Sequence, residues 1–327
     1  MYQTYARYGT HIEKSYYESD HYLKGKAIVE AWLESWLFVK NAKGNVVYTD
    51  DDLGDKTVLR SDGTAIYITQ DLALAQLRYD DRNMDRMVYV VGNEQSDHFK
   101  FLFSILKTMG LPFADKCYHL SYGYVSLPDG RMKSREWNVV DADNLIDDMH
   151  TQSYEILKER YPDLPNDQLH TKAEAIAMAA IKFFVLKYDA TKDFVFDREH
   201  SLRFDWETGP YVQYTYARCS WILTKAWSVA NDPDYSLLVE DQERLLLVHL
   251  NTFSELIQNA ADRYQPYLVV RYALELAQLF NSYYQHHTIN DSDNKPISDA
   301  RLWLVRAIQQ VLHNALTIVG IEVLEEM

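Results

Sequence analysis

The hydrophobic pattern of the chain changes near residue 150, and this change limits the folds that the chain can adopt. Before it, Met87–Val91 (MVYVV) is a continuous apolar run that ends at Gly92, and the helical segment HFKFLFSILKTMG follows. Such a run is typical of a strand buried on both faces of a parallel sheet that helices cover. Ala65–Thr69 (AIYIT) and Tyr118–Leu127 are two further expected strands. The first half therefore predicts an α/β fold.

After residue 150 the pattern is helical throughout. Thr171 and Glu174 form a capping-box signature, and apolar residues then recur three and four positions apart. Three further apolar stripes follow, starting at Leu246, Val269 and Leu304. These stripes predict the core of a helix bundle. The expected fold class is therefore α/β followed by all-α, with domains at residues 1–150 and 151–327.

The composition excludes several classes of protein. With 33 Lys and Arg against 48 Asp and Glu, the net charge is −15, which argues against binding nucleic acid by bulk charge but not through local basic patches. No apolar stretch of about 18 residues is present, and the N-terminus lacks a secretory signal, so we expect no membrane association. Two distant cysteines, Cys117 and Cys219, exclude a disulfide framework and a Cys-rich zinc site. We expect a cytoplasmic protein without a metal site.

Three cations lie on a turn directly after the last expected strand of the first half. They are Arg131, Lys133 and Arg135, in the segment RMKSR. Cations on a loop at the carboxyl end of a strand suit a polyphosphate leaving group, because its negative charge grows in the transition state. Three basic residues on a turn are more often a solvated surface. The order RMKSR followed by NVV is much harder to attribute to chance.

This segment resembles the KMSKS loop of class I aminoacyl-tRNA synthetases, in the form found in arginyl-tRNA synthetases. Arg131 stands at the first Lys of that pattern and Arg135 at the last. Three other segments resemble motifs of the same family in the same order: SDGTAIYITQDLA (61–73), VVGNEQSDHF (90–99) and FDWETGPYVQYTYAR (204–218). The resemblance covers essentially the whole chain. It implies a partial Rossmann-like catalytic domain, then a helical stem and an anticodon-binding bundle.

The resemblance also implies an activity and a set of site residues. An arginine–tRNA ligase activates L-arginine with ATP, releases pyrophosphate and transfers the arginyl group to tRNA(Arg), with Mg²⁺ accompanying ATP. The implied catalytic residues are Arg131, Lys133, Ser134 and Arg135. The implied arginine-binding residues are Glu18, Tyr67, Asp71 and Gln95. The implied ATP-binding residues are Gly92, Glu94, His98 and Met132. The implied tRNA-binding residues are Asn281, Tyr284 and Arg301.

The chemistry of the arginine site is reasonable, although each residue also has a simpler explanation. A guanidinium is a planar fork of five donors, so it needs fixed acceptors such as the Asp71 carboxylate and the Gln95 amide oxygen. We expect these two side chains to converge across adjoining strand ends. Alternatively, Asp71 is a helix N-cap, Tyr67 a core aromatic residue of a strand and His98 a structural residue.

The tRNA-binding residues have equally simple explanations. Asn281 and Tyr284 could stack on or bond to unpaired bases, or be ordinary bundle residues. Arg218, Lys225 and Lys187 fit either contacts with the tRNA backbone or solvated helix faces. The sequence leaves these alternatives open.

The HIGH motif that class I synthetases carry on an early strand–helix turn is absent. The fragment THIEK (10–14) has only the His-Ile pair. We therefore expect a chain that begins inside the catalytic domain and is inactive alone. Two alternatives are a catalytically silent tRNA-binding fragment and one half of a split synthetase whose N-terminal half is a separate chain. We expect a monomer. A cysteinyl-type synthetase is disfavoured because zinc ligands are lacking.

Three tryptophans stand where the family has glycine: Trp36, Trp137 and Trp206. The chain has only 11 glycines and as many as 7 tryptophans. A bulky residue at a glycine turn strains the backbone. The hypothesis is that these codons are UGA, which the source organism reads as glycine. UGG codons at the three positions would exclude it.

Overall fold

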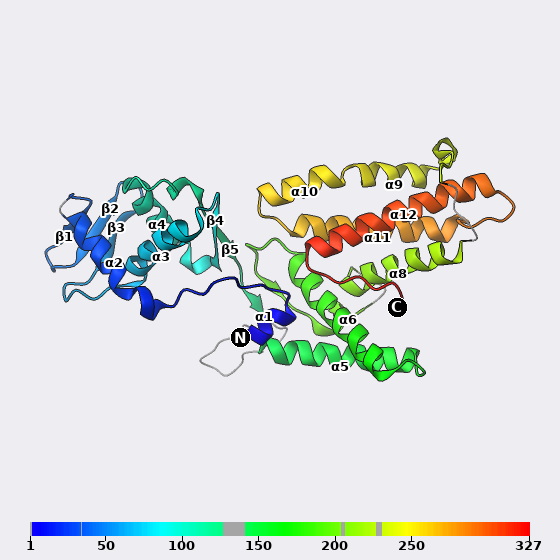
Figure 1. Ribbon diagram of the computed structural model, residues 1–327, viewed down its shortest axis with the longest axis horizontal. Helices are drawn as coiled ribbons and strands as arrows, with labels where there is room; N and C mark the ends of the chain where they lie inside the picture. The colour runs from blue at the N-terminus through cyan, green and yellow to red at the C-terminus, as the bar shows by residue number, and fades with distance from the viewer. Residues whose placement is uncertain (1, 34, 127–140, 204–206, 227–230) are drawn as a thin grey trace. The chain divides into compact units, whose positions relative to one another are not determined.

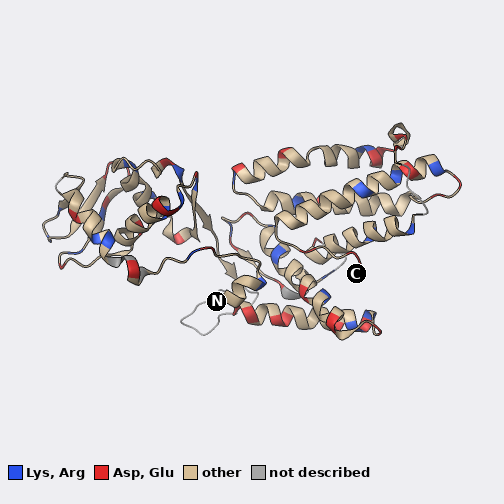
Figure 2. Ribbon diagram, viewed as in Figure 1, with Lys and Arg blue, Asp and Glu red and all other residues tan. Residues whose placement is uncertain are grey.

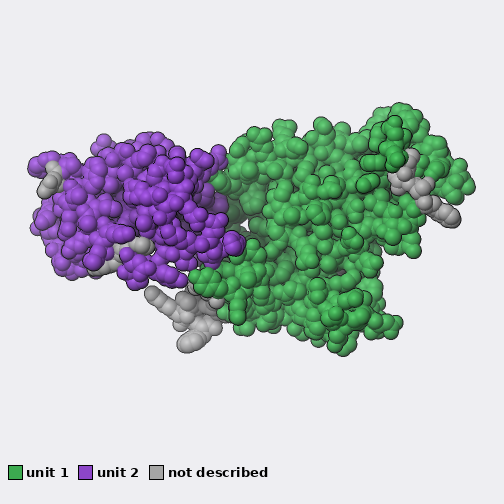
Figure 3. All heavy atoms as spheres, viewed as in Figure 1, with its two compact units in different colours: residues 1–10, 125–327 green, residues 11–124 purple. Residues whose placement is uncertain are grey.

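The computed structural model describes residues 2–33, 35–126, 141–203, 207–226 and 231–327. It contains two compact units (Figure 3). Unit 2 is residues 11–124, and unit 1 is residues 1–10 together with 125–327. Position 150, where we expected a domain boundary, falls inside helix α5 (Ala142–Arg160) of unit 1. The chain therefore passes from unit 1 to unit 2 and back again.

Unit 2 holds the mixed α/β part (Figure 1). Its helices are α2 (Glu18–Leu33), α3 (Tyr67–Arg82) and α4 (Ser96–Thr108), with short 3₁₀ turns η1 (Asn93–Gln95) and η2 (Ala114–Lys116). Its strands are β1 (Phe38–Lys40), β2 (Val46–Asp50), β3 (Gly54–Leu59), β4 (Met87–Gly92) and β5 (Cys117–Tyr122). The strands β1, β2 and β3 form an antiparallel sheet, and β4 pairs with β5 in parallel. Helix α2 packs so closely on α3 at Gly25 that only glycine fits there. A Cβ at this position would lie 2.2 Å from the carbonyl oxygen of Thr69.

The expected strand at Ala65–Thr69 is wrong, because helix α3 begins at Tyr67. The Thr69 hydroxyl donates to the carbonyl oxygen of Val58 and accepts from the backbone N–H of Ile66 at 3.3 Å. These hydrogen bonds fix the first helical turn to β3 and outweigh the β propensity of the segment. Asp71 therefore lies in the second turn of α3, and its predicted role as the N-cap of the helix is also wrong.

The predicted parallel pairing of Met87–Val91 is confirmed. Strand β4 runs in register with β5 from Met87↔Cys117 to Gly92↔Tyr122, and helix α4 connects the two strands. Only one face of β4 is buried. Met87 and Tyr89 are buried, whereas Val88 and Val90 are exposed, so the expectation that both faces are covered is wrong within the described residues.

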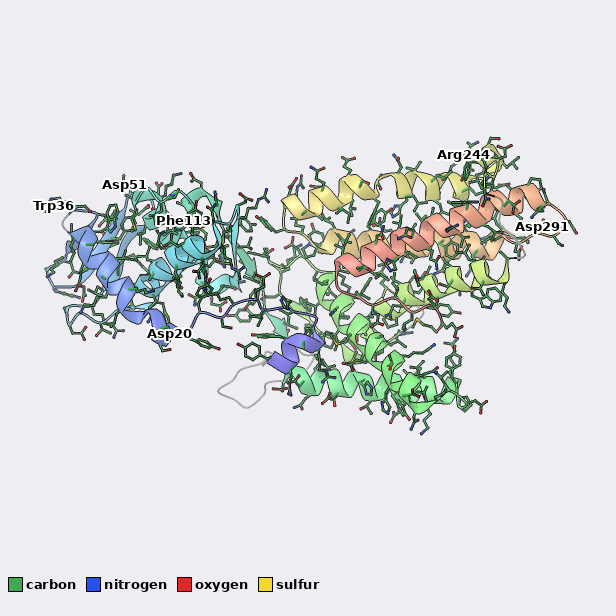
Figure 4. The ribbon with its side chains drawn as sticks, in the orientation of Figure 1. Asp20, Trp36, Asp51, Phe113, Arg244 and Asp291 are labelled. Carbon is green, nitrogen blue, oxygen red and sulfur yellow. The ribbon has the colours of Figure 1, made fainter. Side chains whose placement is uncertain are left out.

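Trp36 has a left-handed backbone, with φ +66°. It lies between α2 and β1, at the edge of unit 2, and its side chain is 83% exposed (Figure 4). Left-handed backbone favours glycine, because a Cβ clashes there with the following carbonyl oxygen. The conformation is therefore the one that the glycine hypothesis requires at this position. Trp137 and Trp206 lie outside the described residues.

Unit 1 is mainly helical, as expected. Its helices are α1 (Tyr2–Arg7), α5, α6 (Asn166–Leu186), α7 (Arg198–Ser201), α8 (Gly209–Lys225), α9 (Asp241–Asn251), α10 (Phe253–Asp262), α11 (Tyr267–His286) and α12 (Lys295–Ile318). Two short strands, β6 (Val125–Ser126) and β7 (Phe194–Val195), pair in parallel, and η4 (Tyr235–Leu237) is a 3₁₀ turn. Helix α8 packs on α6, α11 and α12, and α11 packs on α9 and α12. The buried faces of these helices form one core.

In unit 1 the start of one helix and the continuity of another differ from the sequence expectation. Helix α6 begins at Asn166, so Thr171 is inside the helix, where its hydroxyl donates to the carbonyl oxygen of Asp167 at 2.9 Å. Glu174 accepts from Arg7 at 3.1 Å, which ties α1 to α6. The stripe that starts at Leu246 belongs to two helices, because α9 ends before Thr252 and α10 begins after it.

Among the described residues, no helix is long and apolar enough to cross a membrane.

Candidate functional site

Asp71 is paired with His98 in unit 2. Oδ2 of Asp71, on α3, lies 2.7 Å from Nε2 of His98, on α4, and both side chains are partly buried. His98 also packs edge-on against Phe99, with ring centroids 5.3 Å apart. The pair links the second turn of α3 to the first turn of α4. It therefore fixes a carboxylate close to the carboxyl end of β4.

The other residues predicted around this carboxylate lie on the turn between β4 and α4. Gln95 closes η1, three residues before His98, and is exposed. The carboxylate of Glu94 folds over Gly92, where a Cβ would lie 2.5 Å from Oε2 of Glu94. The predicted ATP-binding and arginine-binding residues of this segment thus share the carboxyl end of one parallel strand. In open α/β sheets this end is the usual ligand position.

Of the other residues predicted for the catalytic part, the structure describes the side chain of Tyr67 but not those of Glu18 or the KMSKS-like residues. Tyr67 begins α3 and is 79% exposed, so it is not the core aromatic residue of the alternative interpretation. Glu18 begins α2, but its side chain lies outside the described part of the structure. The KMSKS-like residues Arg131, Met132, Lys133, Ser134 and Arg135 also lie outside the described residues.

A cavity of about 500 Å³ lies in unit 1, on α8, α11 and the C-terminal tail; we call it the Arg218 pocket. Its aromatic walls are Tyr161, Tyr214, Trp221 and Tyr284, and Met327 also lines it. Arg218 lies against two of these rings, 4.8 Å from the centroid of Tyr214 and 5.1 Å from that of Tyr284. Positions 214, 218 and 221 of α8 are spaced four and three residues apart, so their side chains lie on one helical face.

Arg218 is held in place by a buried amide. Nη1 of Arg218 donates to Oδ1 of Asn281, and Nδ2 of Asn281 donates to the Thr215 hydroxyl at 2.8 Å. Asn281 is only 8% exposed, so its amide has little contact with solvent. The predicted tRNA-binding residue Asn281 therefore orients a cation beside the pocket from inside the bundle. Tyr284, predicted for the same role, lines the pocket itself.

Neighbouring cations change the pKa of Tyr214, one of the aromatic walls of the Arg218 pocket. The hydrogen bond from Arg218 lowers the pKa of the Tyr214 phenol below its ordinary value, and the charges of Arg218 and Arg160 act in the same direction. Arg160 lies 5.9 Å from the Tyr214 ring centroid. Two guanidinium groups thus flank one aromatic wall. Figure 2 shows basic residues on α6, α8 and α11, although the chain as a whole is acidic.

The C-terminal tail forms a wall of the pocket because polar contacts hold it there. Nε2 of Gln213, which is fully buried, donates to the carbonyl oxygen of Glu322 at 2.7 Å. Nζ of Lys172 donates to the carbonyl oxygen of Glu326 at 2.8 Å. These bonds place Met327 at the pocket. Gln213, Tyr214 and Trp221 were not predicted as site residues, although the helical spacing of Tyr214 and Trp221 around Arg218 can be seen in the sequence.

Arg301 has a structural partner inside unit 1, and its predicted contact with tRNA stays a prediction. Nε of Arg301 lies 2.8 Å from Oε1 of Glu243, which is completely buried, and Tyr283 donates to the same oxygen at 3.0 Å. A buried carboxylate needs a partner cation, because an unpaired buried charge costs several kcal/mol. This requirement accounts for Arg301, which does not line the Arg218 pocket.

The arrangement can hold a flat, electron-rich ring. Aromatic walls and an oriented guanidinium stack on the faces of nucleobases, which requires no large net positive charge. Within the described ranges, no group of three or more His, Cys, Asp or Glu side chains could hold a metal ion. The two sites thus differ in kind, with a fixed carboxylate in unit 2 and a cation–aromatic pocket in unit 1.

Sequence models of two protein families match the chain. The model described as "tRNA synthetases class I (R), catalytic domain" matches residues 10–198, more than half of the chain. The model described as "DALR anticodon binding domain" matches residues 212–327. The first match includes Asp71 and His98, and the second includes the α8 and α11 residues of the Arg218 pocket.

Relatives and solved structures agree with these matches. The arginine–tRNA ligases of Treponema denticola and Flavobacterium psychrophilum are each 40% identical to this chain over 99% of its length. The chain spans only 57% and 55% of those proteins. The arginyl-tRNA synthetase of Thermus thermophilus is similar over the whole chain, with a TM-score of 0.89 and 25% identity, and the match covers 62% of that structure. This chain therefore belongs to the arginyl-tRNA synthetase family.

Proposed function

We propose that this chain binds tRNA(Arg) through the Arg218 pocket, which receives an unpaired base of the tRNA. The observation that carries the proposal is the orientation of Arg218, held by buried Asn281 between the rings of Tyr214 and Tyr284. An extruded base would stack on these rings or on Trp221, and the guanidinium would face its acceptor atoms. A pocket of about 500 Å³ has room for a base.

We propose that unit 2 contributes to the activation of L-arginine by ATP. Asp71 would accept the substrate guanidinium, with Tyr67 and Gln95 beside it, and His98 would hold the carboxylate in position. Gly92 and Glu94 would face the nucleotide at the end of β4, where backbone N–H groups suit phosphate. Mg²⁺ would be carried mainly by the ATP phosphates and water. The charge-stabilising role of Arg131, Lys133, Ser134 and Arg135 rests on the sequence motif.

The complete reaction would join L-arginine to tRNA(Arg) with release of pyrophosphate. Because the chain spans little more than half of its curated relatives, we propose that it does not catalyse this reaction alone. The rest of a synthetase would be needed to complete the catalytic domain. A catalytically silent tRNA-binding chain is the second candidate, and the Arg218 pocket supports it equally.

The two candidates separate in one experiment. Arginylation of tRNA(Arg) is measured with this chain alone, and then with the unmatched remainder of the Treponema denticola relative added as a separate or fused polypeptide. Activity only with the remainder, abolished by Asp71→Asn, supports the enzyme. Binding of tRNA without activity in every combination supports the silent module. If tRNA is not bound at all, both proposals fail.

A further inference from the structure

Two histidines meet across the helix hairpin that α5 and α6 form in unit 1 (Figure 1). Nε2 of His150, on α5, lies 3.4 Å from Nδ1 of His170, on α6, and the two ring planes are parallel. His150 is half-buried and His170 is exposed, so solvent reaches the pair. An imidazole nitrogen that carries no proton has a lone pair, which can bind a metal ion. The pair therefore offers two candidate metal ligands at one point of the surface.

Contacts with Tyr154 hold the two rings in place. The ring of Tyr154, one turn after His150 on α5, stacks on His170 with centroids 4.5 Å apart and planes inclined by 20°. The hydroxyl of Tyr154 donates to Oδ1 of Asn166, one turn before His170 on α6, at 2.9 Å. The two helices are thus linked on one side of the histidine pair. The pair is positioned before any ion arrives, which reduces the entropy lost on binding.

On the other side of the pair, Arg7 of α1 links the same two helices. Its guanidinium lies 2.7 Å from Asp147, three residues before His150, and 3.1 Å from Glu174, four residues after His170. Two carboxylates against one guanidinium leave a formal charge of −1 beside the histidines. A negative charge at this distance favours a cation at the pair.

The distance between the two ring nitrogens matches a tetrahedral metal ion. With Zn–N bonds of about 2.0–2.1 Å, a tetrahedral angle separates two ligand nitrogens by about 3.3–3.4 Å. A right angle, as in square-planar or octahedral sites, would separate them by about 2.9 Å. The observed 3.4 Å is also long for a hydrogen bond. Small rotations of the rings would aim both lone pairs at one ion, so the geometry suits Zn²⁺ better than metals that prefer right angles.

We propose that His150 and His170 bind one Zn²⁺ ion, which links α5 to α6. Among the residues that the structure describes, no group of three or more His, Cys, Asp or Glu side chains is placed to hold a metal, so water completes the coordination. No metal site was expected from the sequence, and spacing does not reveal this pair, since the two residues are 20 positions apart. Neither residue lines the Arg218 pocket, so the inference does not depend on the proposed function.

Zinc binding fixes the tautomer of each ring. With the metal on Nε2 of His150 and on Nδ1 of His170, the ring protons lie on Nδ1 of His150 and on Nε2 of His170. No proton is released when both rings start neutral. Because only the folded hairpin brings the two nitrogens together, the ion also stabilises the folded chain.

The test titrates the full chain with ZnCl₂. Isothermal titration calorimetry is expected to show one bound ion per chain, and the melting temperature is expected to rise with the Zn²⁺ concentration. His150→Gln and His170→Gln each remove one of the two protein ligands but keep a polar side chain. Each variant is expected to weaken Zn²⁺ binding roughly tenfold or more and to abolish the rise in melting temperature. The matched control is His286→Gln, because His286 is an exposed histidine of α11 with its own backbone partner, the carbonyl oxygen of Ser282.

Nitrogen-15 NMR of the unchanged chain keeps the test decisive if a variant fails to fold. Zn²⁺ is expected to shift the signals of Nε2 of His150 and Nδ1 of His170 and to leave those of His286 in place. A chain that binds no Zn²⁺ would overturn the inference. Equal binding by the double variant His150→Gln/His170→Gln, or shifts confined to other histidines, would show an adventitious ion only and would overturn it as well.

Discussion

The guanidinium of Arg218 lies 5.1 Å from the ring centroid of Tyr284, and the buried amide of Asn281 keeps it there. The two residues come from α8 and α11. The contact therefore depends on the packing of these two helices, and the cation is oriented before any ligand arrives. Such preorganisation reduces the entropy lost on binding.

Asn281→Ala is expected to loosen Arg218 and to weaken RNA binding. The variant also removes one hydrogen-bond partner from the buried Thr215 hydroxyl and one from the Arg218 guanidinium, at a cost of about 1–3 kcal/mol in the free energy of unfolding. Asn281→Asp keeps an acceptor for Arg218 and is expected to retain more of the RNA affinity. Urea unfolding and fluorescence anisotropy measure the two effects. Equal RNA affinity for both variants would argue against a positioning role.

The pKa of Tyr214 is expected to lie below the ordinary value of 10.0, because Arg218 hydrogen-bonds to the phenolate form. The unfolded-state pKa is then the higher one. The resulting stabilisation is present in full above the unfolded pKa and is lost as the pH falls through the folded pKa. Carbon-13 NMR of the tyrosine Cζ signals, assigned with Tyr214→Phe, measures this pKa. Arg218→Gln should raise it, and an unchanged value would contradict the contact.

Trp36→Gly is expected to stabilise the protein. Relief of the left-handed strain contributes about 1–2 kcal/mol, and the greater freedom of glycine in the unfolded chain offsets about half of that. The control is Trp32→Gly, which removes a half-buried side chain from α2 and should destabilise. Urea midpoints compare the two variants. A loss of stability in Trp36→Gly would remove the structural support for a glycine at this position.

Arg301→Met is expected to destabilise unit 1 by about 3–5 kcal/mol, because it leaves the buried Glu243 carboxylate without a cation. The double variant with Glu243→Gln should recover much of the loss. RNA affinity of the folded fraction should stay close to that of the unchanged chain. A stable single variant with weakened RNA binding would instead support the predicted contact of Arg301 with tRNA.

The sequence predicted the larger features of the fold because hydrophobic periodicity is a local signal. The parallel pairing of Met87–Gly92 and the helices around Ala177, Val269 and Leu304 follow from it. The predicted strand at Ala65–Thr69 is wrong because a hydrogen bond between Thr69 and Val58 holds the start of helix α3. Val58 lies 11 residues before Thr69, so the local hydrophobic pattern does not reveal this contact. The expected burial of both faces of β4 is wrong because an apolar run does not show which residues cover each face, and Val88 and Val90 are exposed in the described part of the structure.

In the candidate sites, too, the sequence revealed residues that belong to local motifs but not the contacts that they make with distant residues. Asp71 was found from a motif, but its partner in the structure is His98, a contact between two helices that spacing alone does not reveal. The convergence of Asp71 with Gln95 stays a prediction. The ion pair of Arg301 with buried Glu243 was not predicted, because the two residues are 58 positions apart in the chain, and the tRNA contact of Arg301 stays a prediction. Trp221 was overlooked although it stands three residues after Arg218 on the same helix.

The most direct test of the account is the binding of a fluorescently labelled anticodon stem–loop of tRNA(Arg) to this chain, measured by anisotropy. Trp221→Ala and Tyr284→Leu are expected to weaken binding by about 1–3 kcal/mol for each stacked base, or roughly fivefold to a hundredfold. The matched control is Tyr235→Ala, since Tyr235 is 53% exposed against 55% for Trp221 and does not line the Arg218 pocket. The account predicts that only the pocket variants lose affinity. Equal affinity in all three variants, or no binding by the unchanged chain, would contradict it.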